Sequence, residues 1–171
     1  MSHWPVRIAS IALVASTLGC GWPMEPSRPA IYRFSLGADT HAGFGYLVTF
    51  TMDGEARDIR SADLLPNVEC VGRVSLAAYD AVARVIETEG FFALGAQYGP
   101  GNSSAITVVT SALRDGNAKN VRSHPGTEPA SLARVQEAIS DLRQATSWTA
   151  VSGRPLDQKF CRISYFSEVA R

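Results

Sequence analysis

Apolar side chains occupy every second position from Phe44 to Met52, which is the period of a β-strand with one buried face. Asp53-Gly54 follows, a pair of residues that tolerates the positive φ of a tight turn. Residues 56–61 then return with strand-forming composition. The segment predicts an antiparallel hairpin.

A helix is predicted after this hairpin, because Ser75 can cap its start and Gly90 can end it. Its apolar face consists of Leu76, Tyr79, Val82, Ala83 and Ile86. The same order then recurs: residues 106–112 and 118–123 form strands around Asp115-Gly116, and residues 129–145 form a helix. The buried positions of this second helix are Leu132, Val135, Ile139 and Leu142.

The two hairpins also agree in sequence, since five of nine positions are identical between residues 53–61 and 115–123. Aromatic residues follow both helices, Phe91-Phe92 after the first and Trp148 after the second. We interpret this as a duplicated ββα unit. Convergence is the alternative, because Asp-Gly turns and alternating strands restrict residue choice.

The short connections favour an antiparallel sheet, and both amphipathic helices need an apolar surface to cover. The predicted fold is therefore α+β, a two-layer sandwich with two helices on one face of an antiparallel sheet. Residues 31–36 would add a strand at the start. Residues 160–166 would add one at the end and bring Cys161 toward Cys70.

The first nineteen residues have the order of an export signal: a polar start with Arg7, an apolar run over residues 8–18, and Gly19 before Cys20. The apolar run spans roughly 18 Å as a helix, which is too short for a bilayer core of about 30 Å. We expect residues 1–19 to be removed.

Residues 16–20 resemble the lipobox of bacterial lipoproteins, whose cysteine is acylated and becomes the new N-terminus. The family usually has Leu three positions before the cysteine, where this chain has Thr17. The resemblance implies lipidation of Cys20 with palmitate or a similar chain, and hence a membrane anchor. Ordinary signal cleavage and an unprocessed Cys20 are the alternatives. Because Gly21 follows, the sorting pattern favours the outer membrane, facing the periplasm.

Residues 20–30 carry the lipidated cysteine and a proline at every third position, Pro23, Pro26 and Pro29. Such a segment is extended by roughly 3 Å per residue. We interpret it as a tether, and residues 31–171 as a single α+β domain.

Two cysteines remain if Cys20 is acylated, and the compartment outside the inner membrane is oxidising. Cys70 and Cys161 can then form a disulfide. Two unpaired buried thiols are the alternative.

Tyr46 lies seven positions before Asp53-Gly54, and Tyr98 follows the run Gly90-Phe91-Phe92-Ala93-Leu94. Together with residues 106–108 and 128–142, these positions resemble a bacterial family of unknown function that is often found in exported lipoproteins, and the resemblance covers roughly residues 44–148. Members often have Cys-Pro before the strand tyrosine, where this chain has Gly43-Phe44. The resemblance implies location and fold but no known activity.

Charge excludes one class of partner. Sixteen basic residues balance sixteen acidic ones, and only Arg7 lies in the leader, so the mature chain has a net charge near minus one. Nucleic acid demands a basic face, and we expect no nucleic-acid partner.

Candidate chemistry is sparse. Asp39 with His41, and His124 with Glu128, could offer metal ligands, but neither pair reaches the three or four that zinc requires, so we name no metal and no cofactor. The loop at residues 99–104 is glycine-rich and contains Ser103 and Ser104, yet it precedes a strand rather than a helix and lacks a nucleophile elbow.

Two surface features have both a functional and a structural interpretation. The aromatic residues Phe91, Phe92 and Tyr98 could form a partner-binding patch, although core packing explains them as well. Basic residues on the hairpins, Arg57 and Lys119, Arg60 and Arg122, could lie on the outer sheet face, interleaved with acidic residues as on any solvated surface.

These observations predict an anchored envelope lipoprotein with a non-catalytic binding module, which would contact an envelope protein or a small ligand through its open sheet face or the 99–104 loop. The alternative is a hydrolase or metal-dependent enzyme whose site the sequence does not reveal. No catalytic residue is named.

Overall fold

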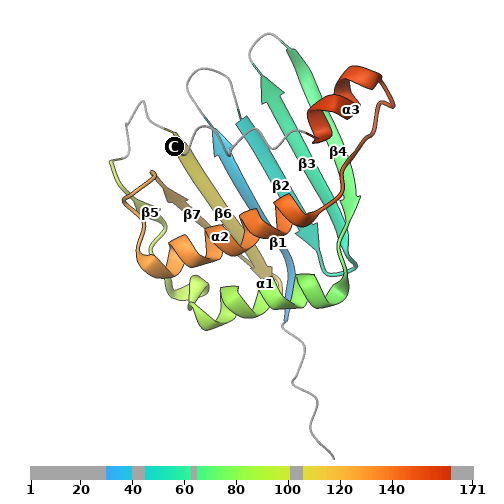
Figure 1. Cartoon of the computed structure of the whole chain (residues 1–171). Helices are drawn as coiled ribbons and strands as arrows, with labels where there is room; N and C mark the ends of the chain where they lie inside the picture. Colours follow the sequence, from blue (N-terminus) through green and yellow to red (C-terminus); the bar gives the residue numbers. More distant parts are fainter. Residues whose placement is uncertain (1–29, 40–44, 63–64, 101–105, 163–171) are drawn as a thin grey trace, which may run out of the picture.

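The structure is a computed structural model that describes residues 30–39, 45–62, 65–100 and 106–162. Within these ranges the chain is α+β, with one mixed eight-stranded sheet, three α-helices and a 3-10 turn (Figure 1). The expectations for Cys20, His41 and Phe44, for the tether, and for Ser103 and Ser104 lie outside the described residues.

The sheet is built from long central strands and short outer ones, in the order β5-β7-β6-β1-β2-β3-β4-β8. Its strands are β1 (Ile31–Asp39), β2 (Gly45–Thr51), β3 (Glu55–Ala62), β4 (Leu65–Arg73), β5 (Gln97–Tyr98), β6 (Thr107–Arg114), β7 (Asn117–Ser123) and β8 (Thr149–Ala150). The β2–β3 and β6–β7 hairpins lie on either side of β1, which pairs with β2 and with β6.

Helices α1 (Leu76–Thr88) and α2 (Ala130–Ala145) lie side by side in Figure 1 and contact each other. Both helices were predicted. Ser75 caps α1, because its side chain accepts a hydrogen bond from the Ala78 amide at 3.2 Å. The predicted apolar positions of both helices are buried in one cluster with the central strands, except Leu76, which is exposed.

The core is aromatic at its centre. Phe34 of β1 stacks on Tyr79 of α1 with ring centroids 4.8 Å apart, and lies 5.5 Å from Phe50 of β2. The buried Tyr79 hydroxyl donates to the Ile31 carbonyl at 3.0 Å, so its polar end is satisfied. This contact joins α1 to the first residue of β1.

The two hairpins have the same Asp-Gly pair in different turns. Three residues separate β2 from β3, with Gly54 at φ 83°, whereas only Asp115 and Gly116, both at positive φ, separate β6 from β7. A difference of one residue moves every later side chain to the opposite face of the sheet. Accordingly Asp58 is buried while its aligned Asn120 is exposed, and Ile59 is exposed while Val121 is buried.

The structure corrects two predictions about the sheet and the C-terminal segment. The sheet is mixed rather than antiparallel, because β5 pairs with β7 in parallel. Residues 160–162 belong to helix α3 (Pro155–Arg162) and not to a strand. Pro155 fits the first turn of a helix, where no backbone donor is needed.

The predicted disulfide is confirmed. Cys70 of β4 and Cys161 of α3 are bonded, with their Cα atoms 5.7 Å apart. Both residues are buried in a small second cluster with Val68 and Ala150. The bond therefore fixes α3 to one end of the sheet.

Candidate functional site

The sheet surface turned away from the core carries exposed apolar side chains, and we call it the outer face. Leu47, Ile59 and Val71 are 44%, 36% and 37% exposed, while the residues next to them, Val48, Asp58 and Cys70, are fully buried on the core side. Exposed and buried side chains therefore alternate along β2, β3 and β4, and the two sets lie on opposite faces of the sheet.

Six strands contribute one residue each to a continuous line across this face, which we call the central row. Leu47 of β2 pairs with Gly37 of β1 on one side and with Ile59 of β3 on the other. Gly37 also pairs with Val109 of β6, and Ile59 also pairs with Glu69 of β4. Val109 is in turn opposite Arg122. The central row is Arg122, Val109, Gly37, Leu47, Ile59 and Glu69.

The middle of the central row is apolar and its ends are oppositely charged. Leu47 leans over Gly37, since a Cβ added to the glycine would lie 3.3 Å from Leu47 Cδ1. Arg122 is exposed, and Glu69 forms an ion pair with Arg57 at 3.2 Å. The adjacent line of cross-strand neighbours contains small polar residues, Ser111, Ser35 and Thr49, followed by Arg57 and Val71.

A shallow hollow of about 560 Å³ lies at the β4 end of the outer face. Its polar lining includes Arg57, Arg73, Ser147 and Thr149, and Gly72 forms part of it. Arg73 lies 4.0 Å from Glu55, so positive and negative groups are both present. Arg57 is also paired with Glu69, so both arginines of the hollow lie next to a carboxylate.

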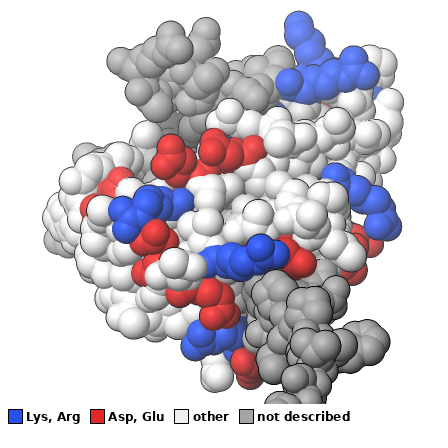
Figure 2. Space-filling view, turned by 60° about the horizontal axis from the view of Figure 1, so that its bottom comes forward, with Lys and Arg blue, Asp and Glu red and all other residues white. Residues whose placement is uncertain are grey.

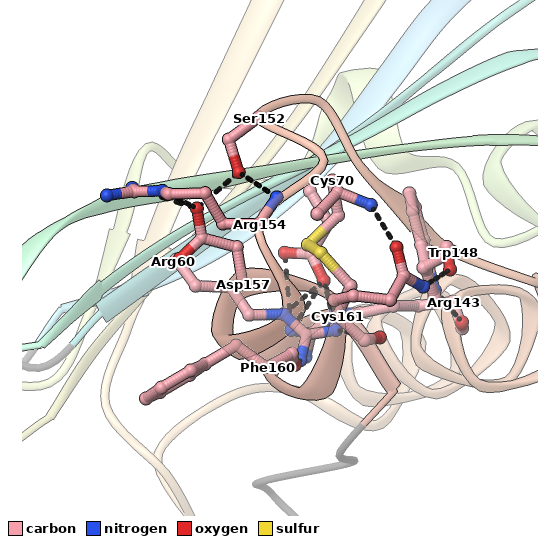
Figure 3. Close-up of a disulfide and its surroundings, with 12 residues drawn as sticks. Arg60, Cys70, Arg143, Trp148, Ser152, Arg154, Asp157, Phe160 and Cys161 are labelled. Atoms are coloured by element: carbon pink, nitrogen blue, oxygen red, sulfur yellow. Dashed lines mark hydrogen bonds and ion pairs between the residues drawn. A yellow bond between two sulfur atoms is a disulfide. The ribbon is translucent and has the colours of Figure 1, made fainter.

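The core side holds a buried ion cluster next to the disulfide (Figure 3). The Asp58 carboxylate, with no solvent exposure, accepts from Arg60 Nε at 2.8 Å and from Arg143 Nη2 at 2.9 Å. Both arginine side chains are 11% exposed. A buried carboxylate between two guanidiniums is a structural tie between β3 and α2, because the pairing offsets the cost of burying the charges.

Aromatic and backbone groups complete the surroundings of these arginines. The Arg143 guanidinium lies 4.0 Å from the ring centroid of Tyr46. Burial raises the pKa of the Tyr46 phenol, although the charge of Arg143 acts in the opposite direction. Arg60 donates to the carbonyls of Phe160 and Cys161, which belong to the last turn of α3.

The start of α3 is fixed by a second polar group. The Asp157 carboxylate accepts from the Ser152 hydroxyl and from Arg154 Nε, the latter at 2.9 Å. These bonds, the Ser152 hydrogen bond first, hold the pKa of Asp157 below its ordinary value. Both ends of α3 are thus tied to neighbouring segments.

Of the histidine and carboxylate candidates, the structure describes Asp39, His124 and Glu128. Asp39 is at the exposed end of β1, whereas His124 is buried and its Nδ1 lies 3.1 Å from the Ile106 carbonyl. One carboxylate oxygen of Glu128 is buried and has no hydrogen-bond partner among the described residues. Among the described residues, no group of three possible metal ligands occurs.

The aromatic candidates mostly belong to the core. Phe91 is fully buried, and Phe92 and Tyr98 are partly buried against the same cluster. Phe92 packs edge-on against Phe91, with Arg114 4.2 Å above its ring. Packing therefore explains these three side chains. At the start of the 99–104 loop, Gly99 has φ 91° and lies against His124.

The expectation that four basic hairpin residues share the outer face is wrong for two of them. Arg60 points to the core side and binds Asp58, and Lys119 donates to the Leu94 carbonyl. Residues three apart on a strand face opposite sides, so Arg57 and Arg60 cannot share a face. The sequence did not predict the ion cluster of Asp58, Arg60 and Arg143. The one signal for it is the spacing of two residues between Asp58 and Arg60, which places both side chains on the same face of a strand.

Charges are mixed on the face that Figure 2 presents, where basic and acidic side chains lie interspersed. Among the described ion pairs, Arg134 contacts Glu89 at 2.6 Å and joins α2 to the end of α1. The Arg134 hydrogen bond lowers the pKa of Glu89.

Comparison with known proteins assigns no relative: no family model matches the chain, and no curated protein matches it. No helix within the described ranges is long and apolar enough to span a membrane.

Proposed function

We propose that the protein is a lipid-anchored lipoprotein of the bacterial cell envelope and that its domain is a non-catalytic binding module which uses the outer face. The observation that carries this proposal is the exposure of Leu47, Ile59 and Val71 on neighbouring strands, opposite a fully packed core. Adjacent exposed apolar side chains on a rigid sheet are typical of an interaction surface.

The anchor is supported by the order of the leader and by Cys20 at its end. Several acyl chains at about 0.8 kcal/mol per buried methylene group would hold the protein on the membrane. The ten residues between Cys20 and Ile31 would reach roughly 30 Å as an extended proline-rich segment. In this proposal the anchor is in the outer membrane and the domain faces the periplasm.

The proposal includes one detail of the fold: α1 and α2 cover the same face of the sheet and leave the outer face open. Support comes from the shared core cluster and from the position of both helices in Figure 1. The ββα duplication is not part of the proposal, because aligned residues of β3 and β7 face opposite sides.

Metabolic labelling with a palmitate analogue tests the anchor. We expect the wild-type chain to incorporate the label and to fractionate with membranes, and Cys20→Ser to do neither. An unlabelled wild-type protein that is exported in soluble form would contradict the anchor.

Photo-crosslinking in intact cells tests the outer face. A crosslinking amino acid at Ile59 should capture a partner, whereas the same group at Leu156, which is 62% exposed on α3, should not. Equal capture at both positions would contradict binding through the outer face.

A further inference from the structure

We infer that the partner bound by the outer face is a second copy of this chain, packed sheet against sheet about a two-fold axis that runs parallel to the strands between β1 and β2. The inference rests on the proposed function and specifies its partner. Three independent properties support it: the sequence of the central row, the end of the sheet at which β1 begins, and the size of the face.

The central row is complementary to its own reverse. Rotation about an axis between Gly37 and Leu47 places the partner's row over this one in the opposite direction. Arg122 then lies opposite Glu69 of the partner subunit, and Val109 opposite Ile59 of the partner subunit. Next to the axis, each Leu47 lies opposite Gly37 of the partner subunit, so the two Leu47 side chains, each of which leans over its own Gly37, meet at the axis. Sheets packed in this way lie about 10 Å apart.

The other two-fold arrangement is unfavourable. A two-fold axis that also lies midway between the two sheets, but runs perpendicular to the strands, would place each strand over its own copy. Arg122 would then face Arg122 of the partner subunit, and Glu69 would face another Glu69. Like charges across an interface oppose association, whereas opposite charges favour it. Charge therefore selects the axis parallel to the strands.

The tether favours the same axis. β1 begins at Ile31, and the nine residues of β1 extend over roughly 30 Å. An axis parallel to the strands keeps the first residues of both β1 strands at one end of the dimer, so both lipid anchors can enter one bilayer. The perpendicular axis would place them at opposite ends, about as far apart as one tether can reach.

The outer face is large enough for a modest interface. Six strands at about 4.8 Å spacing and about six residues of each strand give a footprint of roughly 24 by 20 Å. Two such faces bury roughly 1,000 Å², near the lower limit for a specific protein contact. We therefore expect a dimer that dissociates on dilution and is favoured by confinement to a membrane.

Charge reversal at the two ends of the central row tests the arrangement. The full acylated chain, in detergent, is measured by sedimentation over a range of concentrations. Arg122→Glu alone should weaken the dimer at least about tenfold, because each interface then contains two repelling carboxylate pairs. Glu69→Arg alone should weaken it by a similar factor. Arg84→Glu, on the exposed side of α1, is the matched control and should leave the dimer unchanged.

Mixing the two variants gives the decisive measurement. In a mixed dimer, the acidic side chain introduced at position 122 of one copy meets the basic side chain introduced at position 69 of the other. The native Glu69 and Arg122 also meet, so differently tagged Arg122→Glu and Glu69→Arg chains should associate as tightly as wild type.

Three outcomes would overturn the inference. They are a wild-type chain that stays monomeric at high concentration, mixed variants that remain dissociated, and capture of an unrelated protein at Ile59 without self-capture. Palmitate labelling reports on the anchor separately, so failure of the anchor and failure of the dimer are distinguishable.

Discussion

Asp58 and Cys70 are direct cross-strand neighbours on β3 and β4, and each is joined to a different helix. Asp58 binds Arg143 of α2, and Cys70 is bonded to Cys161 of α3. This pair of neighbouring residues thus attaches both helices that follow β7, α2 and α3, to the sheet. Arg60 links the two ties, because it contacts Asp58 and the last carbonyls of α3.

Loss of the disulfide should loosen α3 before the rest of the domain. The bond closes a separation of 91 residues, and removing a native disulfide of this kind costs about 2 to 4 kcal/mol. We expect Cys70→Ala with Cys161→Ala to lower the free energy of unfolding by that amount in urea denaturation. Hydrogen exchange should accelerate most in α3. A variant in which α1 and α3 lose protection equally would show that the bond supports the whole fold instead.

Removal of the buried carboxylate should be more damaging than removal of an exposed one. Asp58→Ala leaves Arg60 and Arg143 buried without their shared partner, which costs about 3 to 5 kcal/mol. The free energy of unfolding is the quantity to compare. Asp141→Ala, on the exposed side of α2, is the control and should change it by less than about 0.5 kcal/mol. Similar losses in both variants would contradict a structural role for Asp58.

The sequence predicted those elements that have their own period or cap. β2, β3, α1, β6, β7 and α2 were found because the apolar residues of each element recur at the spacing of a strand or a helix, with Ser75 and the Asp-Gly pairs marking the boundaries. The strand expected at residues 31–36 was also found, as β1. β4 was missed, since Pro66 and Asn67 disfavour a strand and tertiary pairing with β3 and β8 stabilises one there. β5 and β8 have two residues each and no period to detect.

The candidate site was predictable only in part. Cys70 and Cys161 could be paired because few partners existed, but the strand expected at Cys161 is a helix. The central row depends on the register of six strands, and the extra residue in the β2–β3 turn decides which residues of β3 face outward. Local sequence does not reveal which strands are neighbours, so neither this row nor the Asp58 cluster could be foreseen.

The two turn glycines should differ in their tolerance of a side chain. Gly54 and Gly116 both have positive φ, at 83° and 79°, so alanine is strained at either position. A Cβ at Gly54 would also lie 2.7 Å from the Val74 carbonyl oxygen. A Cβ at Gly116 would have no atom of the other described residues within 4 Å, its two chain neighbours aside. We expect Gly116→Ala to cost about 1 kcal/mol of stability and Gly54→Ala at least about 1 kcal/mol more. Thermal unfolding of the two variants makes the comparison, and equal losses would refute the role of the Val74 contact.

Acid should release the start of α3 through Asp157. The pKa of this carboxyl is held below its ordinary value by Ser152 and then Arg154, so the folded state favours the charged form. The stabilisation is fully present above the ordinary aspartate pKa of about 3.9 and is lost as the pH falls through the lower folded-state pKa. Asp157→Asn should therefore be less stable than wild type at pH 7, and the difference should shrink below about pH 4. Urea unfolding of both proteins between pH 7 and pH 3 measures the difference directly, because the other carboxylates titrate equally in each. A gap that stays constant over this range would show that Asp157 acts by shape rather than by charge.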